Sequence, residues 1–122
     1  MEEMHLAAIL HKGISGDPAD INAAEAIIMA TSNGSKAIGF EKGGRLEAGM
    51  LADIILLDTS SLHFTPINDP LGAVAYTAQG GDVDTVIING ELVYENREFK
   101  TIDIEYVKYM FNKRYERLFN NE

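Results

Sequence analysis

The dipeptide Asn89-Gly90 constrains the fold more than any other part of this sequence. It separates two short apolar runs, Val83–Ile88 and Glu91–Tyr94, in the stretch VDTVIINGELVYEN. A two-residue hairpin turn of type I′ needs positive φ at both central residues, and asparagine followed by glycine meets that need. The sequence therefore predicts that these two runs pair as antiparallel strands.

A further strand is predicted upstream, in the stretch GGRLEAGMLADIILLD. Residues 52–58 form a short apolar run rich in branched side chains, which favours a buried strand. We expect Gly43, Gly44 and Gly49 to provide the tight turns that lead into it.

The segment Leu71–Ala78 is ambiguous between strand and helix. Its branched and aromatic residues favour a strand, namely Val74, Tyr76 and Thr77. The prediction for this segment is therefore a strand, with a helix as the alternative.

Helical periodicity marks the N-terminal end of the chain. Apolar residues recur at helical spacing as far as Leu10, and Gly13 is expected to stop this helix after residue 12. The pattern begins without a capping residue before it. We therefore expect the natural helix to begin upstream of Met1.

A second helix is predicted from about Asn22. Asn22 and Glu25 form an asparagine variant of the capping box, in which each side chain bonds the other residue's amide. Asn33-Gly34 predicts a break or a cap within this helix. We expect two pieces, about 22–32 and 34–38, that end at Gly39.

The last predicted helix runs from Asp103 to about Phe119, with Asp103 or Thr101 as its cap. One face is apolar and consists of Ile104, Val107, Phe111 and Leu118. A basic cluster also lies on this helix, and it is interleaved with Glu105 and Glu116; its members are Lys108, Lys113, Arg114 and Arg117. We interpret the cluster as a solvated helix face rather than a nucleic-acid site.

Helices followed by short strands and a final helix indicate an α+β fold. The 122 residues suffice for one domain with a modest core, and 46% hydrophobic residues argue against disorder. A net charge of −9 opposes binding to nucleic acid. Apolar runs fall far short of the ~20 residues of a membrane span. The acidic start, Met1 to Met4, lacks the basic region of a secretory signal, so we expect a cytoplasmic protein.

Three histidines are the candidates for a metal site, because cysteine is absent. His5 and His11 lie six residues apart, about 240° around a straight helix, so they do not share a metal. His63 has Asp69 six residues on, which is too loose a pair to define a site. We interpret His11 as a polar residue near a helix C-terminus and His63 as a hydrogen-bonding loop residue.

Other catalytic patterns are also missing from the sequence. Neither Ser15 nor the serines of TSNGS lie in a small-x-Ser-x-small turn between strand and helix. The glycine-rich stretch EKGGRLEAG does not lie between a strand and a helix N-terminus, as a phosphate-binding loop must. Asp82/Asp84 and Asp103/Glu105 are interpreted as turn and cap residues. The sequence thus predicts no catalytic, cofactor-binding or metal-ligating residue in this chain.

Residues 23–58, AAEAIIMATSNGSKAIGFEKGGRLEAGMLADIILLD, strongly resemble the C-terminal signature of the amidohydrolase superfamily. There, a helix carrying E-A-x-x-M-A-T-x-N-G leads into G-x-L-E-x-G-x-x-A-D and a hydrophobic strand. Residues 68–99 resemble the family's closing pattern, D-P followed by V-I-V-N-G. The start EEMHLAAILHKGISGDP and the loop HFTPINDP are most similar to the cytosine-deaminase-like branch. That branch includes methylthioadenosine/S-adenosylhomocysteine deaminases and atrazine-type chlorohydrolases. Met50-Leu51 departs mildly from the usual Lys-x before Ala-Asp.

The resemblance implies a (β/α)8 barrel whose metal ligands, a His-x-His pair, later histidines and an Asp, all lie upstream of this chain. The chain then corresponds to terminal helices of the barrel plus part of the small composite β-sandwich domain of metallo-dependent hydrolases. Its implied parts are the last helical segments of the barrel (1–40), sandwich strands with the Asn-Gly hairpin (41–100) and the C-terminal amphipathic helix (101–122). Positions 33–34, 52–53 and 89–90 match structural positions of the family. At these positions we expect Asp53 to accept hydrogen bonds from backbone donors at the turn into the strand.

In function, the resemblance implies a parent hydrolase that uses zinc or iron to deaminate a nucleoside-like or heterocyclic substrate. This chain alone is expected to be scaffold, to bind no cofactor, and to have the missing N-terminal barrel part as its partner. Exposed apolar faces and open strand edges lead us to expect a homo-oligomer when the chain is alone. The alternative is a stand-alone noncatalytic β module that self-associates or binds a protein partner.

Overall fold

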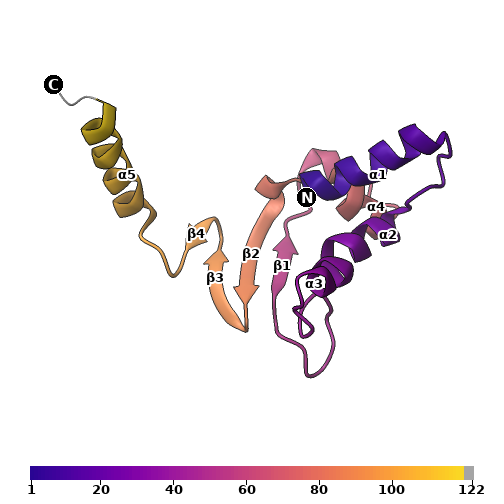
Figure 1. Ribbon diagram of the computed structural model, residues 1–122, viewed down its shortest axis with the longest axis horizontal. Helices are drawn as coiled ribbons and strands as arrows, with labels where there is room; N and C mark the ends of the chain where they lie inside the picture. The colour runs from indigo at the N-terminus through magenta and orange to yellow at the C-terminus, as the bar shows by residue number, and fades with distance from the viewer. Residues whose placement is uncertain (120–122) are drawn as a thin grey trace.

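The computed structural model describes residues 1–119 (Figure 1). A group of helices lies beside one face and end of a four-stranded sheet, and a C-terminal helix stands apart from both. The architecture is therefore a mixture of helices and sheet, as predicted. The predicted segment 101–122 extends beyond the described residues at positions 120–122.

Helix α1 spans Glu2–Ser15, three residues further than expected. Gly13 lies inside it, and the chain leaves the helix at Gly16, whose φ is 70° and whose amide bonds the carbonyl of Lys12. The prediction that Gly13 stops the helix is wrong. Glycine inside a helix costs only about 1 kcal/mol, whereas the left-handed cap conformation selects glycine strongly.

The second helix begins as predicted, with α2 at Ala23–Ile28. Asn22 Oδ1 accepts from the Glu25 amide at 3.1 Å, and Glu25 Oε2 accepts from the Asn22 amide at 2.9 Å. The predicted break at Asn33-Gly34 is wrong. A π-helical turn, Met29–Asn33, continues directly into α3, Gly34–Ala37, and Gly34 keeps the right-handed conformation. The wider turn absorbs the irregularity without ending the helix, which does end before Gly39 at φ 73°.

The loop after α3 folds back, and at Gly44 it contacts the preceding π-helical turn. The Ser32 hydroxyl donates to the Gly44 carbonyl at 2.9 Å. Gly44 has φ 77°, and a Cβ there would lie 2.6 Å from the Thr31 carbonyl oxygen. Gly49, with φ 90°, completes the turns that were expected before the first strand.

The sheet has the order β1-β2-β3-β4, and every neighbouring pair is antiparallel. Its strands are β1 Ile54–Leu57, β2 Val83–Ile88, β3 Glu91–Glu95 and β4 Glu98–Phe99. The predicted hairpin is confirmed, because Ile88 pairs with Glu91 and the turn residues Asn89 and Gly90 both have positive φ. The prediction of a buried first strand is wrong, since Ile55 and Leu56 are each about half exposed.

Hydrogen bonds join the dipeptide Ala52-Asp53, before β1, to the hairpin turn Asn89-Gly90. Asp53 Oδ1 accepts from the Asn89 amide at 2.7 Å, and the Gly90 amide donates to the Ala52 carbonyl at 3.0 Å. The role expected of Asp53 is thus confirmed. Its donor lies in the hairpin turn, so the carboxylate fixes that turn against the start of β1.

Residues 70–77 are helical, so the strand prediction for Leu71–Ala78 is wrong. They form the short α4, Pro70–Gly72, and the π-helical turn η3, Ala73–Thr77. Asp69 caps the start by accepting from the Leu71 amide at 3.0 Å, with proline at the first helical position. Burial of Ala75 against α1 and α2 then stabilises helix over strand.

The small core lies where α1, α2 and η3 meet. Its fully buried residues are Ala8, Ala26 and Ala75, whose small side chains let the three helices approach closely. Partly buried apolar side chains pack around them: Met4, Ile21, Ala23, Ile27 and Tyr76. The remaining short elements are the 3₁₀ turns η2, Leu62–Phe64, and η4, Gly80–Asp82.

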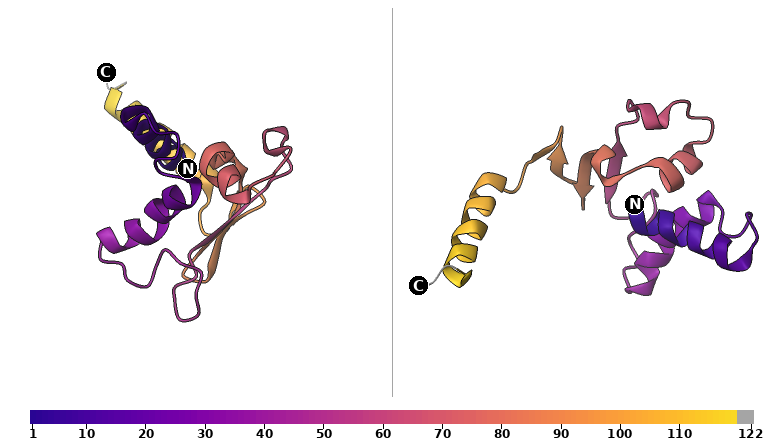
Figure 2. Two further views of the ribbon diagram at one scale, coloured as in Figure 1. Left: turned by 90° about the vertical axis from the view of Figure 1, so that its right-hand side faces the viewer. Right: turned by 90° about the horizontal axis from the view of Figure 1, so that it is seen from above.

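Helix α5, Ile104–Phe119, lies on the far side of the sheet from the other helices, as the view from above in Figure 2 shows. Asp103 caps it, accepting from the Tyr106 amide at 2.9 Å, which confirms one of the two predicted caps. Its residues are all at least partly exposed. Within residues 1–119, none of the helices has the length and apolar character needed to cross a membrane.

Candidate functional site

The closest contact between a histidine and a carboxylate joins two loops at one end of the sheet. His63 Nε2 lies 3.0 Å from Asp82 Oδ2. The same carboxylate oxygen accepts from the Gln79 amide at 2.8 Å, and the Asp82 carbonyl accepts from the Asp58 amide at 2.8 Å. Asp82 is buried, whereas the His63 side chain is more than one third exposed. The pair therefore ties η2 to the start of β2.

Hydrogen bonds lower the pKa of two carboxyl groups here. The pKa of Asp82 is lowered chiefly by the Gln79 amide and further by His63, against the opposing effects of burial and of Asp58. The pKa of Asp58 is lowered by the amide and hydroxyl of Ser60, and by Arg97. Both groups are therefore carboxylates at neutral pH, and they act as acceptors that order the loops.

These shifts predict acid sensitivity of the loops. A folded-state pKa below the unfolded value of about 3.9 stabilises the fold above that pH. The stabilisation is lost as the pH falls through the lower folded-state pKa. We therefore expect Asp82→Asn to reduce the pH dependence of the urea midpoint between about pH 5 and pH 2. Identical pH profiles for the two proteins would contradict this role of Asp82.

The three histidines do not come together. His5 contacts the ring of Tyr76 edge-on, with centroids 6.3 Å apart, and His11 is exposed on α1. His63 does act as a loop hydrogen-bonding residue, as predicted, but its partner is Asp82. Asp69, which was judged too loosely spaced from His63 to define a site, caps α4. Among residues 1–119, no three histidine or acidic side chains are placed to hold a metal ion.

Two interactions escaped the sequence analysis because they join residues without a local pattern. His63 and Asp82 lie 19 positions apart. The ammonium of Lys12 donates to the carbonyls of Asp20 at 2.7 Å and Ile21 at 2.9 Å, and lies 5.8 Å from the centre of the Tyr76 ring. Lys12 therefore holds the connection between α1 and α2.

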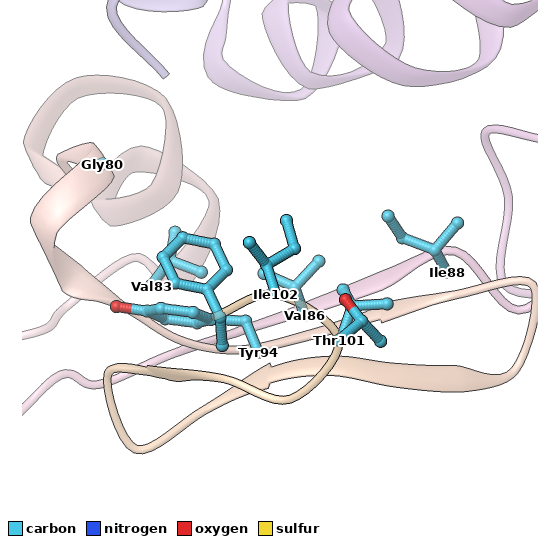
Figure 3. Close-up of a pocket in the computed structure, with 9 residues that line it drawn as sticks. Gly80, Val83, Val86, Ile88, Tyr94, Thr101 and Ile102 are labelled. Carbon is cyan, nitrogen blue, oxygen red and sulfur yellow. The ribbon is translucent and has the colours of Figure 1, made fainter. Parts of the chain in front are cut away.

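An apolar groove lies on one face of the sheet (Figure 3). Val83, Val86 and Ile88 project from β2, and Thr101-Ile102 borders them after β4. Tyr94 and Phe99 close one side, with ring centroids 5.1 Å apart. The cavity has a volume of about 500 Å³.

The chemistry of this groove is that of a contact surface. Among the described residues that line it, none has an ionisable carboxyl, amine or imidazole group, and the polar side-chain atoms are the hydroxyls of Tyr94 and Thr101. Such a surface gains free energy by burying apolar side chains, roughly 25 cal/mol for each Å² removed from water. The candidate functional site of this chain is thus this apolar groove, with the His63–Asp82 contact ordering the loops at the start of β2.

Comparison with known proteins gives consistent relatives. The model of the Amidohydrolase family matches residues 1–93. The 5-methylthioadenosine/S-adenosylhomocysteine deaminase of Acetivibrio thermocellus is 57% identical over 109 residues, which cover 88% of this chain and 25% of that protein. The deaminase of the same name from Thermoanaerobacter pseudethanolicus is 48% identical over 114 residues, 93% of this chain and 26% of that protein. The chain spans about a quarter of the length of these curated relatives.

Solved structures show the same arrangement. An adenosine deaminase from Xanthomonas campestris with bound zinc superposes with a TM-score of 0.90 at 29% identity, over 98% of this chain and 28% of that one. An atrazine chlorohydrolase from Arthrobacter aurescens TC1, complexed with zinc, superposes with a TM-score of 0.78 at 25% identity, over 91% of this chain and 25% of that one. Coverage of 98% means that the first superposition extends into α5.

Proposed function

Since the chain belongs to the amidohydrolase family, we propose that it is the C-terminal scaffold of a metal-dependent hydrolase that deaminates an adenine-type nucleoside. The observation that carries the proposal is the 57% identity to a deaminase over most of this chain. The reaction is hydrolysis of a C–N bond outside peptides, with release of ammonia. Relatives with the same deaminase name favour 5-methylthioadenosine and S-adenosylhomocysteine as substrates.

The proposed role as scaffold rests on where the three histidines, the possible metal ligands, lie. Among residues 1–119, no three histidine or acidic side chains converge on one point, and His5 and His11 lie on different sides of α1. The described residues therefore do not fit a zinc or iron site. We assign the metal, which solved relatives hold as zinc, to the upstream part of the protein.

We further propose the architecture that the family implies. Residues 1–40 are the last helical segments of a (β/α)8 barrel, residues 41–100 are strands of a composite β-sandwich, and residues 101–122 are a terminal helix. The apolar groove on the sheet supports this proposal, because a sandwich needs a second layer on such a face. The half-exposed side chains of Ile55 and Leu56 support it too. The partner of the chain is thus the barrel part of the same protein.

The test is ammonia release by the whole protein, of which this chain is the C-terminal part. We expect turnover of 5-methylthioadenosine, S-adenosylhomocysteine or adenosine at about 1–1000 per second, the range of ordinary enzymes. Chloride release from atrazine is the control for the chlorohydrolase reaction. Absence of ammonia release from all three nucleosides would overturn the proposed reaction.

The noncatalytic alternative makes a different prediction. A stand-alone module requires that the 122-residue chain has no enzymatic parent, and it would self-associate or bind a different protein. Self-association of the isolated chain is also expected from its uncovered apolar faces. Self-association detected by sedimentation therefore reports only on the apolar faces of the isolated chain. Ammonia release by the whole protein decides between the two functions.

A further inference from the structure

The sequence contains two Asn-Gly pairs, and the structure gives their backbones different surroundings. Asn33-Gly34 lies where the π-helical turn continues into α3, and Asn89-Gly90 forms the turn between β2 and β3 at one end of the sheet (Figure 1). Both asparagines are exposed, so burial does not distinguish them. The hairpin pair has positive φ at both residues, 50° and 80°. It is the pair at a loop tip, where local opening costs little free energy.

Asparagine followed by glycine can react within the chain, because glycine has no side chain to shield its backbone nitrogen. In the hairpin, the Gly90 nitrogen would lose its proton and form a bond to Asn89 Cγ. The bond from Cγ to Nδ2 breaks, and the side-chain nitrogen takes up a proton and leaves as ammonia. Water then opens the five-membered imide at either carbonyl, which leaves aspartate or isoaspartate at position 89. The reaction needs water alone, without an oxidant or reductant.

Two hydrogen bonds oppose this reaction in the closed turn. The attacking group, the Gly90 amide, donates to the Ala52 carbonyl at 3.0 Å, and Asp53 Oδ1 accepts from the Asn89 amide at 2.7 Å. Both acceptors belong to the dipeptide before β1, so the turn must separate from that dipeptide before it can react. We propose that Asn89 is a site of spontaneous deamidation, and that Asp53 is a positioning residue that slows the reaction by holding the turn closed. The inference is independent of the reaction proposed above.

The helical pair is protected by hydrogen bonds that continue along the helix. The Gly34 amide donates to the carbonyls of Met29 and Thr31. The Ser32 hydroxyl also donates to the Gly44 carbonyl at 2.9 Å, which ties this part of the helix to the following loop. Because helical hydrogen bonds form and break cooperatively, Gly34 is released only together with its neighbours. Asn33 is therefore expected to react more slowly than Asn89.

Either product at position 89 weakens the contact that held the turn closed. Aspartate adds a carboxylate whose charge repels that of Asp53. Isoaspartate lengthens the main chain by one methylene group, which moves the amide of position 89 away from its acceptor. The change loosens the hairpin from β1, next to Ile88 of the apolar groove. Deamidation at Asn89 is thus a one-way change that accumulates with the age of the molecule.

The test compares the two asparagines in the whole protein. Samples are incubated at mildly alkaline pH, folded and in urea, and peptide mass spectrometry follows conversion of each asparagine to its acid. The urea sample gives the intrinsic rate of each pair, so the ratio of unfolded to folded rate measures protection by the fold. We expect this protection to be at least about tenfold greater for Asn33 than for Asn89. Equal protection of both, or greater protection of Asn89, would overturn the proposed site.

Two variants of Asp53 test its role in the closed turn. Asp53→Ala removes the acceptor and is expected to speed the conversion of Asn89 about tenfold. Asp53→Asn removes the same charge but keeps an acceptor oxygen, so the rate should stay within about twofold of the parent. Slower conversion in Asp53→Ala would mean that the carboxylate promotes the reaction, which would overturn its role as a restraint. An equal rise at Asn33 would mean global unfolding and would likewise contradict a local effect.

Discussion

Gly44→Ala is expected to destabilise the chain by about 3 kcal/mol. Gly44 has φ 77°, which costs an L-residue about 1–2 kcal/mol. The added methyl group would also lie 2.6 Å from the Thr31 carbonyl oxygen, which belongs to the helix backbone and has little freedom to move. Urea unfolding followed by circular dichroism measures the change in free energy.

Gly49→Ala is the matched control for this substitution. Gly49 also has a positive φ, of 90°, but a methyl group there would meet no atom within 4 Å. The control should therefore lose only about 1–2 kcal/mol, the cost of the backbone conformation. Equal losses in the two variants would show that the close approach of the loop to the helix contributes nothing.

The second large effect is expected at Lys12. Lys12→Met keeps the aliphatic stem beside Tyr76 but removes both hydrogen bonds to the carbonyls of Asp20 and Ile21. Ile21 has φ 45°, an unfavourable conformation for a branched residue, so the loop depends on such contacts. Hydrogen bonds from a charged donor contribute about 1.5–3 kcal/mol, and we expect a loss of about 2 kcal/mol.

Lys36→Met controls for the change in net charge. Lys36 is exposed on α3, so the substitution removes one positive charge without removing those two bonds. Its expected change in unfolding free energy is within about 0.5 kcal/mol. A loss of unfolding free energy as large as that of Lys12→Met would mean that the effect comes from the change in net charge. It would then not come from the hydrogen bonds of Lys12 to the α1–α2 connection.

The sequence predicts those parts of the fold that depend on neighbouring residues. Asn89-Gly90 determines the hairpin, and Asn22 with Glu25 determines the start of α2, because each signal satisfies local backbone geometry. The predicted end of α1 at Gly13 is three residues early, because the first glycine after a helical pattern is not always the one that caps the helix. The positive φ of Gly16 makes that residue the cap.

The remaining errors concern contacts between distant residues. Val74 and Tyr76 favour a strand by propensity, but burial of Ala75 against two other helices outweighs that preference. The contact between His63 and Asp82 likewise appears only once the loops at the end of the sheet meet. The composition of strand β1 predicts that it is buried, but the strand is partly exposed. Its burial would need a second layer of structure from outside residues 1–119.

The central claim is that this chain contributes scaffold and docking surfaces, while the metal and the catalytic groups belong to the upstream part of the protein. Elemental analysis of the purified 122-residue chain, combined with an ammonia-release assay on adenosine and 5-methylthioadenosine, tests it most directly. We predict less than about 0.1 equivalent of zinc or iron and no turnover, because the described histidines do not converge on one point. Stoichiometric metal together with turnover would contradict the claim, since His5, His11 or His63 would then have to form a site with nearby carboxylates.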